Sequence, residues 1–180
     1  MKKIAIIGAG GHGLVALDIA RLNGYDDIKL LDDDTKNTRA YGTTELIKKL
    51  KLDHDFFVAI GDNGIRKKFF KKLKNENCRI VSLIHPSAVV SVNVEIGIGS
   101  IIMAGAVINT NAKIGNGCII NTSSSVDHES EVGDFTHIAV GAHLAGAVKI
   151  SENTTIGAGA VVIKNIEKCG IYVGIPAKSK

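Results

Sequence analysis

The sequence has few of the residues that build bulky cores. Aromatic residues make up 4% of its 180 positions, tryptophan is absent and proline occurs only twice. Hydrophobic residues nevertheless reach 45%, supplied mainly by isoleucine, valine, leucine and alanine. This aliphatic content excludes a disordered chain, and it favours thin, regular layers over a bulky core.

Long apolar runs and paired cysteines are also missing. No stretch approaches the roughly 20 apolar residues that span a bilayer. The run Ile4–Ile7 breaks into a glycine-rich turn without a signal-peptide cleavage site. Cys78, Cys118 and Cys169 are odd in number, widely spaced and free of any C-x-x-C pattern. We therefore expect reduced thiols, a cytoplasmic location and no insertion into a membrane.

The charge is small and uneven. The formal net charge is +4, and residues 1–83 hold 16 basic and 11 acidic residues, against 6 and 7 in residues 84–180. A nucleic-acid partner would call for a basic stripe with interleaved aromatic residues, which is lacking. The mild excess in the first half instead suits a small anionic ligand.

An aliphatic residue returns at every sixth position of the second half of the chain. The fourteen positions are Ile84, Val90, Ile96, Ile102, Ile108, Ile114, Ile120, Val126, Val132, Ile138, Leu144, Ile150, Ile156 and Val162. A helix needs a period near 3.6 and an antiparallel strand a period of 2, so neither fits. A small residue stands two positions before most of the fourteen. Three such hexads make one turn of 18 residues, so the pattern predicts a three-sided parallel β-coil over residues 84–180.

The first 83 residues follow a different pattern, in which strands and helices alternate. The predicted strands are 3–7, 28–31, 56–60 and 78–83, and the predicted helices are 14–22, 43–52 and 63–74. This alternation predicts an α/β domain over residues 1–83, a small doubly wound parallel sheet of the Rossmann-like type.

A phosphate-binding candidate lies at the first strand–helix junction. Gly8–Gly13 satisfies G-x-G-x-x-G, and Asp32–Asp34 follow the second predicted strand at the distance where a carboxylate can bond ribose hydroxyls. Only half of a dinucleotide fold precedes the repeats, so we expect one nucleotide. Asn63 and Arg66 begin a helix at the same sheet edge and are candidate nucleotide contacts. The alternative is a glycine turn that merely permits close packing.

The chemical candidate lies in the repeats. Asp127, His128 and Glu129 form the most polar interruption of the aliphatic ladder, and His137 follows nine residues after His128. Neutral imidazole is a common general base near pH 7, and a nearby carboxylate, Glu129 or Asp127, would fix its tautomer and raise its basicity. Neighbouring strand residues point to opposite faces, so Glu129 can serve His128 only if the chain turns there. Because nine residues is half a coil, the two histidines can meet only across a subunit boundary, as in a trimer.

These motifs resemble the bacterial nucleotide-sugar N-acetyltransferases of the hexapeptide-repeat superfamily, which include the 4-amino-sugar enzymes of the bacillosamine pathway. The matching stretches are 121–129, 134–137, 140–142, 145–146 and 173–178, together with the glycine turn and the aspartates. The resemblance implies a left-handed parallel β-helix, a homotrimer with active sites between subunits, and acetyl-CoA as co-substrate without a metal. It implies acetylation of a 4-amino group on a UDP- or dTDP-linked amino-deoxy sugar for surface glycans.

The resemblance also implies residue roles. His128 would deprotonate the amine, Glu129 would raise the basicity of His128, and Asn121 is a candidate for orienting the acceptor. Acetyl-CoA would meet His137, the backbone amide of Gly146 and the region of Ala158. The UDP group would be held by Gly10, Gly11, His12, Asp32 and Asp33. Relative to the bacillosamine-pathway enzymes, the chain is expected to be about one 18-residue coil shorter after Gly146, where contacts with CoA near the C-terminal end would lie.

Three alternatives share parts of this pattern. An O-acetyltransferase acting on a sugar such as a sialic acid would use both domains. A zinc enzyme resembling the β-helical carbonic anhydrases would use His128, His137 and His143, although the nucleotide domain would then have no role. A non-catalytic nucleotide-binding scaffold would need none of the histidines.

Overall fold

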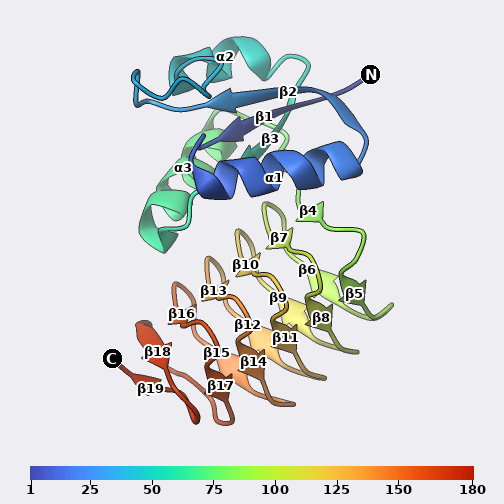
Figure 1. Cartoon of the computed structure of the whole chain (residues 1–180), viewed down its shortest axis with the longest axis vertical. Coiled ribbons are helices and arrows are strands. Elements are labelled where there is room, and N and C mark those ends of the chain that lie inside the picture. The colour runs from blue at the N-terminus through green and yellow to red at the C-terminus, as the bar shows by residue number, and fades with distance from the viewer. The chain divides into compact units, whose positions relative to one another are not determined.

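The computed structural model describes residues 1–180, which divide into two compact units, Met1–Leu83 and Ile84–Lys180. In the first unit, a three-stranded parallel sheet has the order β2-β1-β3 (Figure 1). Its strands are β1 (Lys2–Ile7), β2 (Tyr25–Leu31) and β3 (Asp55–Val58). The helices are α1 (Gly11–Leu22), a 3₁₀ turn η1 (Thr44–Leu46), α2 (Ile47–Leu50) and α3 (Asn63–Asn75).

Two predicted elements of this unit are shorter than expected. The fourth strand, predicted over 78–83, is reduced to a single parallel bridge between Ile80 and Phe56. Phe56 N donates to the carbonyl of Arg79 and its carbonyl accepts from Val81, which uses up both backbone groups of Phe56. The helix predicted over 43–52 is split into η1 and the single turn of α2. A β-branched Thr43-Thr44 start disfavours a regular first turn.

The second unit is a parallel β-solenoid with three flat sides (Figure 1). One side has seven strands: β4 (Leu83–Ile84), β7 (Ile101–Ile102), β10 (Ile119–Ile120), β13 (His137–Ile138), β16 (Thr155–Ile156), β18 (Ile171–Val173) and β19 (Lys178–Ser179). The second has β5 (Val89–Val90), β8 (Val107–Ile108), β11 (Ser125–Val126), β14 (His143–Leu144) and β17 (Val161–Val162). The third has β6 (Glu95–Ile96), β9 (Lys113–Ile114), β12 (Glu131–Val132) and β15 (Lys149–Ile150).

The aliphatic ladder predicted from the hexads forms the solenoid core. The inward residues from Ile102 to Val162 are at most 3% exposed, and Ile84, Val90 and Ile96 of the first coil are partly buried against them. Serine and threonine at the small positions are buried too, and they are satisfied by the backbone. The Ser100 and Ser130 hydroxyls each donate to the carbonyl fifteen residues later, at 2.8 and 2.9 Å. Polar small residues therefore bond one coil to the next inside an apolar core.

The solenoid ends in a hairpin that the repeat pattern did not predict. β18 pairs in parallel with β16 and antiparallel with β19, so the final strand turns back on the last coil. This hairpin gives β18 a partner on both sides, which protects its edge. None of the helices is long and apolar enough to cross a membrane.

Candidate active site

Two glycines at the junction of β1 and α1, Gly8 after the strand and Gly13 in the helix, are required by packing. A side chain at Gly13 would place its Cβ 2.1 Å from the carbonyl oxygen of Gly8. Gly8 itself has a φ of +106°, and a Cβ there would lie 2.6 Å from the Ala59 carbonyl oxygen. The helix therefore packs on the strand with no room for a methyl group at either position.

Gly10 and Gly11 have no such requirement. A Cβ at either would meet nothing within 4 Å, yet both residues line a hollow of about 420 Å³. Gly10 is the N-cap of α1 and has no side chain, so no capping side chain accepts a hydrogen bond from the N–H groups of the first turn. Open space beside helix N–H groups suits the close approach of a phosphate group.

Asp32 and Asp33 line this hollow, and their carboxylates accept hydrogen bonds from the surrounding loops. Asp32 accepts hydrogen bonds from Ala9 N at 2.9 Å, from Asp34 N and from the Asn37 amide. Burial raises the pKa of Asp32, but these hydrogen bonds outweigh it and keep the pKa below its usual range. Asp33 accepts from the backbone N and the hydroxyl of Thr44, at 2.8 and 3.0 Å. An ionised carboxylate still has lone pairs for a ligand hydroxyl.

Arg66 lies behind the hollow. Its side chain is buried, and Nη1 donates to the carbonyls of Ile60 and Gly61 while Nη2 donates to Asn63 Oδ1. Asn63 and Arg66 are thus brought together, but neither lines the hollow. The structure shows them shaping the loop after β3, and a direct contact with a nucleotide stays a prediction.

His12 completes the hollow with an unpartnered nitrogen. Its Nε2 is buried without a hydrogen bond. Burial, and next the nearby Arg66 guanidinium, lower the pKa of His12 to about 4. His12 is therefore neutral at pH 7, and it presents an imidazole without adding positive charge.

Acidification should destabilise the fold through His12. The unfolded chain protonates this imidazole near pH 6.5 and the folded chain only near pH 4, so stability present above pH 6.5 is lost as the pH falls toward 4. We expect wild type to lose about 2 kcal/mol between pH 7 and pH 5 through this group. Urea unfolding at both pH values measures it, with His12→Gln as the control that lacks the loss. An identical pH dependence in the variant would contradict the assignment.

Gly13→Ala and Gly11→Ala form a matched pair for the glycine turn. We expect Gly13→Ala to lower the free energy of unfolding by about 2–3 kcal/mol, because the methyl group collides with backbone at Gly8. Gly11→Ala lies in open space on a helix and should leave stability unchanged or raise it by less than about 1 kcal/mol. Urea denaturation at pH 7 measures both. Equal losses in the two variants would refute this division of the glycines.

His128 lies at an edge of the solenoid where the chain does turn. Glu129 follows with a φ of +58°, and its carboxylate oxygen lies 3.5 Å from His128 Nδ1. Both side chains are more than half exposed. The next coil passes with Gly146 under the ring: a Cβ there would lie 2.6 Å from His128 Nε2. The N–H of Gly146 donates to no group within the chain.

The other predicted residues lie at another edge. Asn121, in the turn from β10 to β11, donates from Nδ2 to His137 Nε2 at 3.0 Å. Ala158 occupies the equivalent turn from β16 to β17 and is exposed. Two pairs of predicted side chains therefore lie together within one chain: Asn121 with His137, and Glu129 with His128. They stand at different edges of the three-sided coil.

His143 belongs to neither pair. Its Nδ1 lies 2.8 Å from the Ser125 hydroxyl on the flat five-stranded side. The chain contains no group of three or more His, Cys, Asp or Glu side chains that could hold a metal ion.

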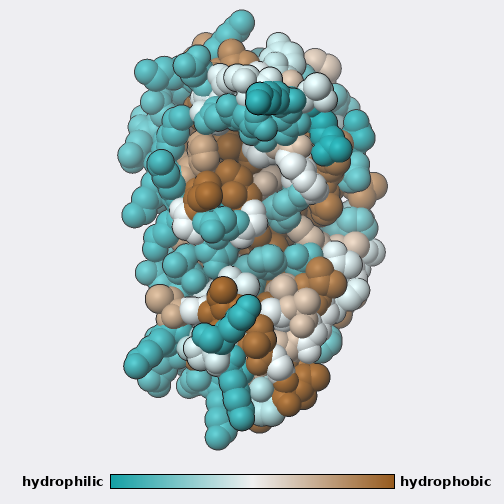
Figure 2. Space-filling model, turned by 60° about the vertical axis from the view of Figure 1, so that its left-hand side comes forward, coloured by the Kyte–Doolittle hydropathy of each residue, from teal (hydrophilic) through white to brown (hydrophobic).

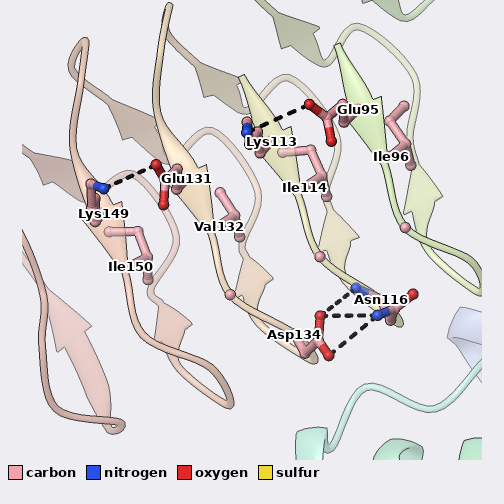
Figure 3. Close-up of a pocket in the computed structure, with 13 residues that line it drawn as sticks. Glu95, Ile96, Lys113, Ile114, Asn116, Glu131, Val132, Asp134, Lys149 and Ile150 are labelled. Carbon is pink, nitrogen blue, oxygen red and sulfur yellow. Dashed lines mark hydrogen bonds and ion pairs between the residues drawn. The ribbon is translucent and has the colours of Figure 1, made fainter. Parts of the chain in front are cut away.

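A hollow of about 410 Å³ on the four-stranded side contains none of the predicted catalytic residues. Its walls are an ion-paired ladder, with Glu95 3.6 Å from Lys113 and Glu131 3.0 Å from Lys149 (Figure 3). The acidic and basic side chains of this face therefore pair with one another.

Comparison with known proteins identifies the family. Residues 3–73 match the PglD N-terminal domain. The acetyltransferase domain of PglB from Neisseria gonorrhoeae FA1090 superimposes with a TM-score of 0.88 at 34% identity, covering 100% of both chains. The chain belongs to the nucleotide-sugar acetyltransferase family. The hexads predict the three-sided parallel coil and the resemblance implies its left hand, and the solenoid is the left-handed parallel β-helix of that family.

Two similar structures contain bound ligands. The same PglB domain is known in complex with acetyl coenzyme A, and it matches with a TM-score of 0.89 and 34% identity over 99% of both chains. PerB from Caulobacter crescentus, in complex with CoA and GDP-perosamine, matches at 33% identity with a TM-score of 0.87, over 100% of this chain and 98% of PerB.

A curated relative gives a shorter match. The UDP-N-acetylbacillosamine N-acetyltransferase of Bacillus subtilis (strain 168) is 39% identical over 112 residues. That match covers 56% of this chain and 50% of the relative, so the aligned part spans half the length of the curated protein.

Proposed function

We propose that the protein transfers the acetyl group of acetyl-CoA to an amino group, predicted to be the 4-amino group, of a UDP- or dTDP-linked amino-deoxy sugar. The observation that carries the proposal is the His128–Glu129 pair lying over Gly146, in a chain that matches the acetyl-CoA-bound PglB domain over 99% of its length. The PerB complex with CoA and GDP-perosamine supports a nucleotide-sugar acceptor.

The geometry supports direct transfer with His128 as general base. Glu129 faces Nδ1, which favours the tautomer with the proton on Nδ1 and the lone pair on Nε2. The amine attacks the thioester carbon and gives its proton to Nε2, and the C–S bond then breaks to release CoA as a thiolate that takes up a proton. The unpaired Gly146 N–H is suited to the acyl oxygen as negative charge develops there.

The first unit is proposed to hold the nucleotide. Helix N–H groups beside Gly10 and Gly11 face the diphosphate, and Asp32 and Asp33 face the ribose or base side of the hollow. Gly11→Ala, which leaves the fold intact, should then weaken UDP binding measured by calorimetry. The three cysteines are free, as in proteins of a reducing compartment, which supports a cytoplasmic enzyme that feeds surface glycan assembly.

A homotrimer with shared sites is part of the proposal. Within one chain His128 and His137 stand at different edges, so a neighbouring copy is needed to bring the two together. The solenoid also leaves large apolar side chains exposed, and hydrophobic patches are visible at the lower end of Figure 2 over the last coils. The exposed apolar residues of that end are Ile163, Ile171, Val173 and Ile175. Light scattering of the full chain measures the assembly.

One assay tests the reaction. Thiol release from acetyl-CoA is followed with a panel of acceptors, namely UDP-, dTDP- and GDP-linked amino sugars, their hydroxyl analogues and free sialic acid. We expect release only with the amino sugars and an N-acetyl product by mass spectrometry. Transfer only to hydroxyl acceptors would establish O-acetylation instead. An acetylated enzyme that accumulates without acceptor would exclude direct transfer.

A further inference from the structure

The backbone around His128 is held by the coils on both sides. Glu129 N donates to the carbonyl of Thr110 in the preceding coil, at 3.1 Å. The His128 carbonyl accepts from Ala147 N in the following coil, at 2.8 Å. Both groups belong to the peptide unit between His128 and Glu129, which these two bonds hold in place. In the peptide group that precedes His128, the Asp127 carbonyl accepts from Ser130 N within the same turn, at 3.4 Å, but the His128 N–H has no backbone partner.

A side chain supplies that missing partner. Asp127 Oδ1 accepts the N–H of His128 at 2.8 Å and the Nδ2 amide of Asn109 at 2.7 Å. Asn109 lies 18 residues earlier, at the equivalent corner of the preceding coil. The Asn109 bond, followed by the bond from the His128 backbone, lowers the pKa of Asp127, so this carboxylate is ionised at neutral pH.

We infer that Asn109 and Asp127 act as a latch that positions His128 for the proposed acetyl transfer, on which this inference rests. Asn109 holds the carboxylate against the preceding coil, and the carboxylate holds the amide of His128. The peptide groups before and after His128 are therefore both anchored, and the imidazole projects from the Cα between them. Displacement of a catalytic group by about 1 Å costs on the order of 10² in rate, so the latch acts on kcat although Asn109 is a coil away.

The latch works by position and not by charge. The charge of His128 is the weakest of the influences on Asp127, behind both hydrogen bonds and burial. The carboxylate that faces the imidazole is Glu129. Asparagine at 127 keeps an oxygen that can accept both bonds, whereas alanine keeps neither, and this difference separates the two modes of action.

The chain contains a matched control pair at another edge. Asn116 donates from Nδ2 to the two carboxylate oxygens of Asp134 at 3.2 and 3.3 Å, again across 18 residues (Figure 3). This pair joins two coils with the same chemistry, but it lies at the edge between the four- and seven-stranded sides, away from His128. Asn116→Ala therefore removes an equivalent link between coils without touching the latch.

The kinetic test compares Asn109→Ala, Asp127→Ala, Asp127→Asn and Asn116→Ala in the full chain with acetyl-CoA and the best acceptor of the panel. We expect kcat to fall about 10–100-fold in Asn109→Ala and Asp127→Ala, with both KM values within about threefold of wild type. Asp127→Asn and Asn116→Ala should keep kcat within about threefold. A wild-type kcat in Asn109→Ala, or an Asp127→Asn as slow as Asp127→Ala, would overturn the latch.

Hydrogen exchange tests the latch without any substrate. The His128 amide is the donor to Asp127, so its exchange, followed by mass spectrometry of peptides covering residues 126–130, should quicken at least tenfold in Asn109→Ala and in Asp127→Ala. It should stay at the wild-type rate in Asn116→Ala. Unchanged exchange in the first two variants refutes the latch. If the wild-type chain acetylates no acceptor, the proposed function fails while this measurement still decides the latch.

Discussion

Alanine in place of His128 is expected to lower kcat by about 10²–10⁴ while both substrates still bind with nearly the wild-type KM. The imidazole is more than half exposed at a corner, so its removal is expected to leave the fold intact. Its loss removes the acceptor for the amine proton but leaves the Gly146 amide and both substrate sites in place. The remaining rate then reflects proximity and the polarised thioester.

Steady-state kinetics with thiol detection measures the effect, and His143→Ala is the matched control. His143 is an exposed histidine of the same solenoid whose ring hydrogen-bonds to Ser125 on the five-stranded side, so its variant should keep kcat within about twofold. The kcat of Glu129→Gln should lie between those of these two variants, because the side chain that faces His128 Nδ1 loses its charge but keeps an oxygen. If His128→Ala raises KM as much as it lowers kcat, the residue binds a ligand and is not the base.

Mixed assemblies test whether the site is shared. His128→Ala and His137→Ala chains are each expected to be slow alone. If one chain supplies His128 and its neighbour supplies His137, subunit exchange between the two variants regenerates some intact sites. Recovery of activity on mixing is then expected, and no recovery after demonstrated exchange would place both histidines in one chain's site.

The repeat could be predicted from the sequence because its period is a property of the backbone. Each hexad contributes one flat side, so a residue such as Ile120 or Leu144 returns to the core whatever its neighbours are. The turn at Glu129 was predicted only as a condition for its pairing with His128. The structure supplies it through a φ of +58°, which several other corners with non-glycine residues also adopt.

Side-chain partners across coils were the part that the sequence analysis missed. Asp127 stood out as a possible orienting carboxylate for the ring, but its oxygen binds the His128 backbone and Asn109. The spacing of 18 residues between Asn109 and Asp127, repeated between Asn116 and Asp134, was a signal that could have found both pairs. Asn121 likewise contacts His137, a partner that no spacing within a strand indicates.

Replacing Gly146 by alanine is the second substitution for which we expect a large effect, a loss of about 10² in kcat with little loss of stability. The new Cβ would lie 2.6 and 2.7 Å from Nε2 and Cε1 of His128. Gly146 does not have a positive φ, so alanine adds no backbone strain. The imidazole is the far end of an exposed side chain and can rotate away, which relieves the clash and removes the base from its place.

A double-mutant cycle separates this effect from loss of the Gly146 amide, which alanine retains. If Gly146→Ala acts through the ring, it should slow wild type about 10²-fold but leave the His128→Ala background within about threefold, because no ring remains to displace. The KM for acetyl-CoA should change little, and thermal unfolding should shift by less than about 4 °C. Additive losses in the cycle would mean that the methyl group blocks the acyl donor directly. Gly146 would then serve to admit the thioester, and its role in seating His128 would be refuted.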